Sequence, residues 1–268
     1  MARFSMSELT TYRWSFEEDV QHYAEAGFEA IAVWRQKLSD CGEQRGRKLL
    51  AESDLQVSSL MWAGGFTGNE GRTYQESMQD AREAIHLAFE LQAPTLLVHS
   101  GARGGHTHNH ARRLLKNALQ DLGPIAAEFG VCLALEPMPL ETALGWTFLH
   151  SMEETLELLD VVASPAVRIA LDCYHWGGEP RFLEKLPQWA PHLAVVHLAD
   201  ADQPPQSDPD RLPLGQGRLP LAKIVRTLQD ADYRGFYEVE LMGEEVEHLD
   251  YRQLLRQSQE TLRTWEEA

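Results

Sequence analysis

Several short apolar segments of this chain end in a side chain that can bind a metal ion or move a proton. Residues 167–172 read Val-Arg-Ile-Ala-Leu-Asp, and His175 follows three residues later. The same pattern recurs in three further segments, which end in Glu136, His197 and Glu240. Short apolar runs with β-branched residues are typical of buried parallel strands, and α/β proteins place functional groups where such strands end. The recurrence therefore predicts one site built from several strand ends.

Strands and helices are predicted to alternate along the whole chain. Strands are expected near residues 4–6, 28–34, 55–61, 95–98, 133–136, 167–172, 194–197 and 236–240. The first helix should begin at Ser15, which forms a capping box with Glu18, and end at Gly27. One face of the helix before residue 95 should be buried, with Met78, Ala81, Ile85, Ala88 and Phe89 on it.

This alternation implies parallel pairing through right-handed crossovers. The chain has 268 residues, which suits a single (β/α)8 TIM barrel of about 250 residues better than an open sheet. No shift in composition suggests a second domain, so residues 1–268 are predicted to form one α/β barrel domain.

The composition limits the partners and the compartment. The formal net charge is −17 and no Lys/Arg-rich stripe is present, which argues against nucleic acid as a partner and favours a neutral substrate. No apolar run approaches the length of a membrane span, and the amino terminus lacks a signal-peptide core. The three cysteines are scattered without a CxxC motif, as in a reducing compartment. We expect a cytoplasmic protein with no membrane partner.

Glu136, Asp172, His197 and Glu240 would converge at the carboxyl-terminal face of a barrel. Three carboxylates and one imidazole form a mostly oxygen ligand set. Such a set suits Mn²⁺, Mg²⁺ or Co²⁺ better than a structural zinc site, although Zn²⁺ stays open.

Other side chains in the predicted post-strand loops have two interpretations each. Arg211 could clamp a substrate hydroxyl, carboxylate or phosphate, or form a surface salt bridge. His99 could contact substrate or make a buried structural hydrogen bond. Four tryptophans could stack on the C–H face of a sugar or pack in the core: Trp14, Trp34, Trp62 and Trp146.

The segments 133–137 (Leu-Ala-Leu-Glu-Pro), 171–175 (Leu-Asp-Cys-Tyr-His), 196–200 (Val-His-Leu-Ala-Asp) and 238–241 (Glu-Val-Glu-Leu) resemble the signature strands of the xylose-isomerase-like TIM-barrel superfamily. Within it, the chain resembles the sugar phosphate isomerase/epimerase group, which includes D-tagatose 3-epimerase, hydroxypyruvate isomerase, 2-keto-myo-inositol isomerase and inosose dehydratase. The resemblance implies one divalent ion, with Mn²⁺ preferred, held by Glu136, Asp172, His197 and Glu240. It further implies acid/base roles for Glu136 and Glu240, and substrate binding by His175 and Arg211; His99 and Trp14 are weaker substrate-binding candidates.

The function implied is isomerisation or epimerisation of a ketose, a keto-inositol or its phosphate through an enediolate. A lyase that dehydrates an inosose or a dehydroshikimate-like acid stays open, because it would share the metal and the first base. A non-catalytic sugar-binding barrel would not need both glutamates. An endonuclease IV-like DNA-repair role is remote, because Met61-Trp62, Pro209 and Arg211 stand where that enzyme has metal ligands. For assembly, a homodimer and a homotetramer are both left open.

Overall fold

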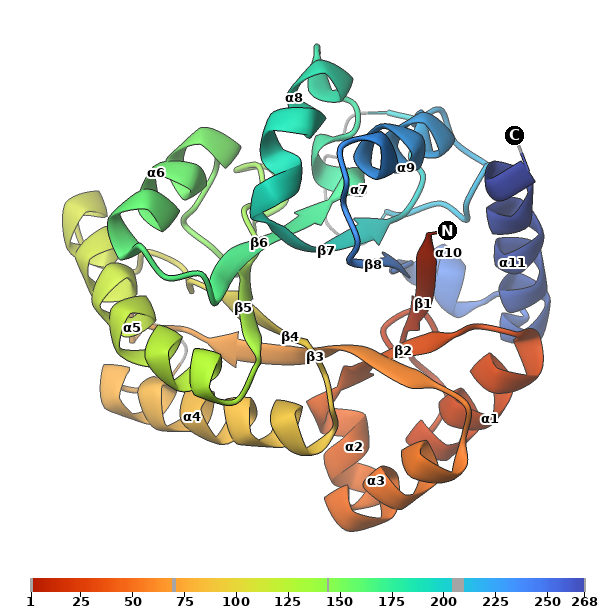
Figure 1. Cartoon of the computed structure of the whole chain (residues 1–268), viewed down its shortest axis with the longest axis horizontal. Helices are drawn as coiled ribbons and strands as arrows, with labels where there is room; N and C mark the ends of the chain where they lie inside the picture. Colours follow the sequence, from red (N-terminus) through yellow and green to blue (C-terminus); the bar gives the residue numbers. More distant parts are fainter. Residues whose placement is uncertain (1, 69–70, 144, 204–209, 268) are drawn as a thin grey trace.

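The computed structural model describes residues 2–68, 71–143, 145–203 and 210–267 of the chain (Figure 1). Eight parallel strands form a closed barrel in sequence order, and this confirms the predicted single (β/α)8 barrel. The strands are β1 (Arg3–Ser7), β2 (Ala30–Trp34), β3 (Gln56–Gly64), β4 (Thr95–His99), β5 (Cys132–Leu135), β6 (Val167–Asp172), β7 (Leu193–Leu198) and β8 (Phe236–Val239). The barrel closes where Ser5 of β1 lies beside Glu238 of β8.

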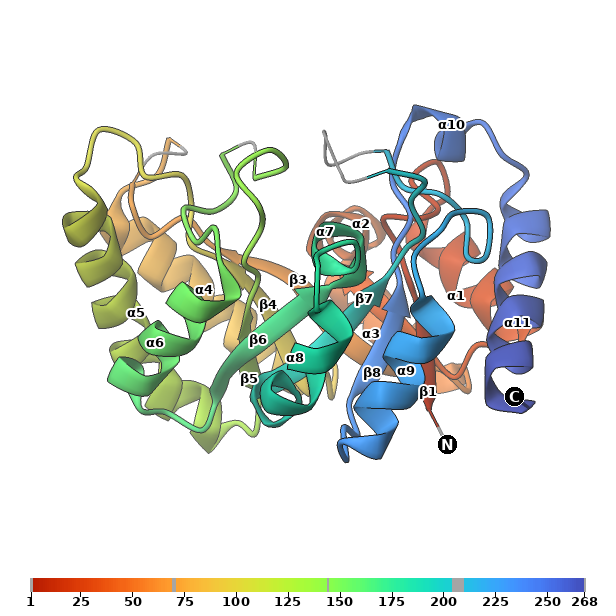
Figure 2. The same ribbon diagram turned by 90° about the horizontal axis from the view of Figure 1, so that it is seen from above.

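The helices surround this barrel. They are α1 (Phe16–Ala26), α2 (Arg35–Cys41), α3 (Glu43–Glu52), α4 (Tyr74–Glu90), α5 (His108–Glu128), α6 (Met152–Val162), α7 (Cys173–Trp176), α8 (Phe182–Trp189), α9 (Leu221–Asp230), α10 (Glu244–Glu247) and α11 (Tyr251–Glu267), with a 3-10 turn at Ala190–His192. Figure 2 shows the loops after the strands gathered on one face, opposite the amino terminus. Among the helices in the described ranges, none has the length and apolar character that a membrane crossing requires.

The local signals at the first helix are confirmed. Ser15 accepts a hydrogen bond from the Glu18 N–H and the Glu18 carboxylate accepts one from the Ser15 N–H, while Gly27 adopts a left-handed conformation at φ 83°. Because an L side chain is strained at that φ, glycine suits this helix end.

Two helix predictions are wrong in detail. The sequence predicts one polar helix after β2 that runs through Leu49 and Leu50, but this segment forms two helices, since Gly42 at φ 90° breaks it. Phe89 was expected in the core but is 52% exposed, and its ring lies 5.2 Å from that of Phe129 on the outside of the barrel. Successive helical residues point about 100° apart, so with Ala88 facing the strands Phe89 turns away from them.

A buried ionic cluster links the loop after β1 to α1 and α2. Lys37 Nζ donates to Asp19 Oδ2 at 2.5 Å and to the Thr11 carbonyl at 2.9 Å. Glu8 lies beside Asp19, and neither carboxylate is exposed. Burial, followed by the charge of Asp19, raises the pKa of Glu8 well above its usual range. Lys37 is therefore the cation that offsets the buried negative charge of this cluster.

Replacing Lys37 by methionine is expected to destabilise the fold by about 3–5 kcal/mol, because Asp19 would be left as an uncompensated buried charge. Urea unfolding of both proteins measures this difference. Lys48→Met is the matched control: Lys48 is 75% exposed and 3.7 Å from Glu52, and its loss should cost less than about 0.5 kcal/mol. Equal stabilities for the two variants would contradict the role given to Lys37.

Candidate active site

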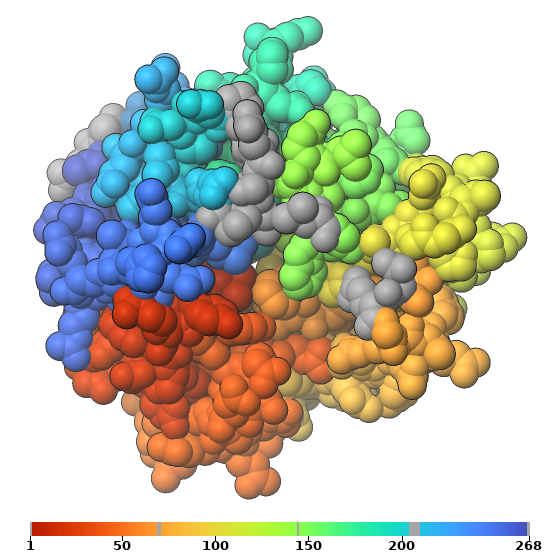
Figure 3. All heavy atoms as spheres, turned by 180° about the vertical axis from the view of Figure 1, so that it is seen from behind, coloured from red at the N-terminus to blue at the C-terminus, as the bar shows by residue number. Residues whose placement is uncertain are grey.

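A cavity opens at the face where the strands end. Six of the strands contribute to its lining, each through its last residues or the loop that follows: Leu9, Trp62, His99, Glu136, Arg211 and Glu240. The cavity has a volume of about 490 Å³, which includes the part open to solvent. Figure 3 shows this face, hollowed near its centre where segments coloured from red through green to blue meet. Beneath it, the barrel interior carries several small side chains, including Ala32, Ala134 and Ala170. Small residues there leave room for a deep polar site.

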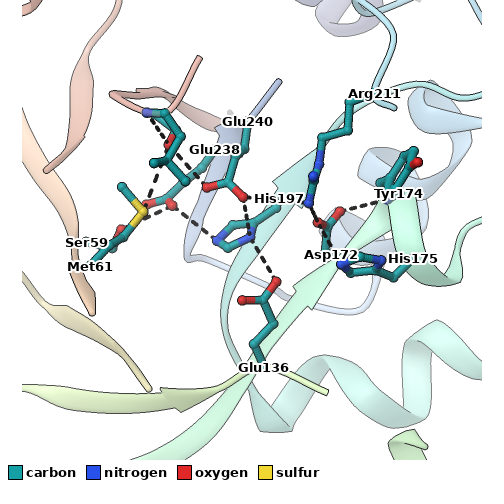
Figure 4. A network of polar contacts seen from close by, with 12 residues as sticks. Ser59, Met61, Glu136, Asp172, Tyr174, His175, His197, Arg211, Glu238 and Glu240 are labelled. Carbon is teal, nitrogen blue, oxygen red and sulfur yellow. Dashed lines mark hydrogen bonds and ion pairs between the residues drawn. The ribbon is translucent and has the colours of Figure 1, made fainter. Parts of the chain in front are cut away.

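Three predicted metal ligands lie close together, and one of them, Glu136, lines this cavity. Glu136 follows β5, Asp172 ends β6 and His197 lies in β7, and one ligand atom from each falls within 4.8 Å of the others. Glu240, just after β8, lies close by, with Oε1 3.7 Å from Nδ1 of His197 (Figure 4). Carboxylate and imidazole donors at this spacing fit a divalent ion.

The ring of His197 is oriented by glutamates on both sides. Its Nδ1 lies 3.7 Å from Glu136 Oε1 and 3.7 Å from Glu240 Oε1, and its Nε2 lies 3.3 Å from Glu238 Oε2. Burial alone would lower the pKa of His197, but these glutamates raise it well above its usual range. With the proton on Nε2 facing Glu238, Nδ1 would present a lone pair to a metal ion.

Glu238 is a site residue that the sequence reasoning missed. Its side chain is fully buried, and Ser59 Oγ donates to its Oε2 at 3.1 Å. Side chains two apart on a strand share a face, so Glu238 and Glu240 both point into the barrel. The Glu-Val-Glu spacing at the end of β8 was the signal that could have identified it.

Asp172 is held by backbone and side-chain donors together. The Tyr174 N–H donates to its Oδ1 at 2.7 Å, and Arg211 Nη2 donates to its Oδ2 at 2.7 Å. Although burial raises the pKa of Asp172, Arg211 and the neighbouring histidines outweigh it, and the pKa lies below its usual value. Asp172 is therefore ionised, as a metal ligand must be.

Arg211 is buried and lines the cavity, so it does not form a surface salt bridge. The carboxylate of Asp200 organises the loop that carries Arg211. That carboxylate accepts backbone N–H bonds from Ala201, Gly215 and Leu219 at 2.9–3.0 Å. The guanidinium is thereby fixed between Asp172 and the cavity.

The remaining predicted substrate residues occupy three different positions. His175 is 3% exposed and lies behind Asp172, with its Nδ1 3.1 Å from the Thr142 hydroxyl. His99 lines the cavity, and its ring meets Trp146 edge-on at 5.3 Å. Trp14 lines a different groove and packs on Tyr251, with the ring centroids 5.2 Å apart.

Glu240 has the electrostatic character of an acid/base group. Burial raises its pKa to about 7, with Glu136 and Asp172 adding to the rise while His197 and Arg211 oppose it. Ser7 Oγ donates to its Oε2 at 3.1 Å. A carboxyl group with a pKa near 7 can both accept and return a proton at neutral pH.

This arrangement matches one family of barrels. A family model described as xylose isomerase-like TIM barrel matches residues 20–265. The chain belongs to that family. Fructoselysine 3-epimerase of Shigella flexneri is 30% identical over 63% of this chain and 59% of its own length. The first curated relatives are matched over about 60% of their own length.

Solved structures share the family's fold. A protein from Sinorhizobium meliloti superposes with a TM-score of 0.88 at 23% identity, covering 98% of both chains. The IOLI protein, whose crystal structure holds a zinc atom, gives a TM-score of 0.83 at 19% identity, covering 98% of this chain and 97% of that one. The 3-dehydroshikimate dehydratase of Bacillus anthracis is also similar in sequence. It is 22% identical to this chain, over 85% of this chain and 86% of its own length.

Proposed function

We propose that this family member is a divalent-metal-dependent isomerase or epimerase of a ketose, a keto-inositol or its phosphate. The observation that carries the proposal is the pair Glu136 and Glu240, each 3.7 Å from Nδ1 of His197 and both lining one cavity. Relatives named as sugar epimerases and isomerases support it.

The ligand set favours one divalent ion, Mn²⁺ first, with Mg²⁺, Co²⁺ and Zn²⁺ as alternatives. Glu136, Asp172 and Nδ1 of His197 would hold it, and Glu240 would complete the set. Such an ion would polarise the substrate carbonyl and lower the pKa of the neighbouring C–H.

The protein's own groups would perform the proton transfer. One glutamate removes the proton next to the carbonyl, and the other returns it to the opposite face or to the adjacent carbon. The first outcome is epimerisation, and the second is isomerisation. Arg211 would orient a substrate oxygen, and His175 would hold Asp172 in place from behind.

Dehydration is the second candidate, favoured by the relative from Bacillus anthracis that is named as a dehydratase. Both reactions begin with the same proton removal and diverge only if a β-hydroxyl leaves. Incubating the metal-loaded protein with ketoses, keto-inositols and 3-dehydroshikimate, followed by mass spectrometry, separates them. An unchanged mass with a new stereoisomer supports the isomerase, and loss of one water supports the lyase. No change in any substrate would contradict both.

Replacing Glu238 by leucine is expected to weaken Mn²⁺ binding by roughly 10–100-fold, because Nε2 of His197 would lose the acceptor that fixes its proton. Competition with a chelator measures the affinity. Glu247→Gln, which removes an exposed carboxylate on α10, is the control and should leave the affinity unchanged. A wild-type affinity in Glu238→Leu would show that Glu238 does not orient His197.

A further inference from the structure

A row of aromatic side chains crosses the rim of the cavity. The ring centroids of Trp146 and Trp62 lie 5.3 Å apart, those of Trp62 and Trp34 6.3 Å, and those of Trp34 and Tyr12 5.8 Å. These residues come from four segments, in or after β1, β2, β3 and β5. The barrel therefore brings together rings that are far apart in the sequence.

The row is open to solvent. Tyr12 is 55% exposed and Trp146 is 41% exposed, while Trp34 and Trp62 are partly buried. Aromatic rings of this size usually bury most of their surface, and a contiguous exposed set beside a cavity is typical of a binding surface.

The row joins the catalytic cavity to a second groove. Trp62 lines the cavity and Trp34 lines the groove, so the contact between their rings connects the two. Tyr12 and Trp14 also line the groove, together with polar side chains that include Gln36 and Asp40. Rings on one side and exposed amide and carboxylate groups on another suit the C–H face and the hydroxyls of a sugar.

The backbones of Trp34 and Trp62 are held in position by the fold. The buried carboxylate of Glu8 accepts a hydrogen bond from the backbone N–H of Trp34 at 2.6 Å. Arg35 donates to the Trp62 carbonyl at 2.8 Å and pairs with Asp80 at 3.0 Å. A backbone fixed before binding loses little conformational entropy when a ligand packs on the side chains that it carries.

The ionic groups of the groove favour a neutral occupant. Arg13 and Lys37 stand beside Glu17 and Asp40, so both signs are present in equal number. Lys37 is paired with Asp19, and Glu17 is paired with Arg45 at 3.1 Å. A charged substituent would therefore find no excess of opposite charge here.

We propose that the substrate is a glycosylated ketose. The ketose unit would occupy the catalytic cavity, and the attached neutral sugar would lie over Trp62 and Trp34 and reach the second groove. This inference rests on the proposed function, because it assigns the ketose unit to the site of Glu136 and Glu240. A free ketose would leave the aromatic row uncovered.

Binding of maltulose, a glucosyl-fructose, and of fructose to the Mn²⁺-loaded protein tests the proposal by calorimetry. Maltulose should bind at least about tenfold more tightly than fructose, since it alone covers the row. Trp34→Ala and Tyr12→Ala should each reduce the ratio of maltulose affinity to fructose affinity towards one and leave fructose binding unchanged. Phe89→Ala, which removes an exposed aromatic ring on the outside of the barrel, is the control and should change neither affinity.

Equal affinities of the wild-type protein for the two sugars would overturn the proposal, as would an equal loss of both in Trp34→Ala. Circular dichroism verifies that each variant is folded. If Trp34→Ala does not fold, the result for Tyr12→Ala decides the test, because Tyr12 is the more exposed of the two residues. The binding ratio needs no turnover, so its failure is distinct from that of the proposed reaction. A preference for maltulose without turnover of any ketose would refute the reaction alone, and turnover without the preference would refute the sugar subsite alone.

Discussion

Replacing Asp172 by alanine is expected to abolish tight metal binding and, with it, turnover. The carboxylates of Glu136 and Glu240 would then face each other with one ligand fewer, and Arg211 would lose its partner 2.7 Å away. The loss of affinity should exceed the roughly 10–100-fold typical of residues that only orient ligands. Elemental analysis after dialysis, together with a chelator titration, measures it.

The matched control is Glu141→Gln, which neutralises an exposed carboxylate in the loop after β5. It should retain one equivalent of metal. Asp172→Ala that still holds a full equivalent of tightly bound metal would remove Asp172 from the ligand set.

Changing either Glu136 or Glu240 to glutamine is expected to lower turnover by roughly 10²–10⁴-fold. Glutamine keeps the shape and an oxygen ligand but cannot act as a base at neutral pH. One of the two variants keeps the glutamate that removes the proton from the substrate, and it should still exchange the α-hydrogen of the substrate with solvent. The other variant keeps the glutamate that removes the proton from the product, and it should still exchange the α-hydrogen of the product. Deuterium wash-in followed by NMR measures this exchange.

Metal content must be checked in parallel, because both glutamates are proposed to hold the ion as well. Near-normal turnover in either metal-loaded variant would rule out the two-base scheme. If neither variant exchanged the α-hydrogen of the substrate or of the product, neither glutamate could be a base that acts alone.

Much of the fold could be predicted because its signals are local. The run ending at Asp172 and the Ser15–Glu18 box each depend on a few neighbouring residues, and both are found as predicted. Glu136, Asp172 and His197 could be predicted to lie together because each stands where a predicted strand ends, and the structure groups these three side chains. Parallel strands end on one face, so sequence position alone places these residues there.

The remaining features depend on neighbours that are distant in sequence. Glu238 becomes a partner of His197 only because β7 pairs with β8, and Ser59 reaches it from β3. Trp34 and Trp62 lie on the neighbouring strands β2 and β3, so their rings meet only once these two strands pair. Phe89 shows the reverse error, since an apolar residue one step off a buried face can still point outward.

Anomalous diffraction from crystals soaked in Mn²⁺ tests directly whether these four residues hold a metal ion. We expect one strong peak between these side chains, within about 2.0–2.3 Å of Nδ1 of His197 and of oxygens from Glu136, Asp172 and Glu240. A peak elsewhere in the molecule, or none at this position, would contradict the assignment of this site as a metal centre.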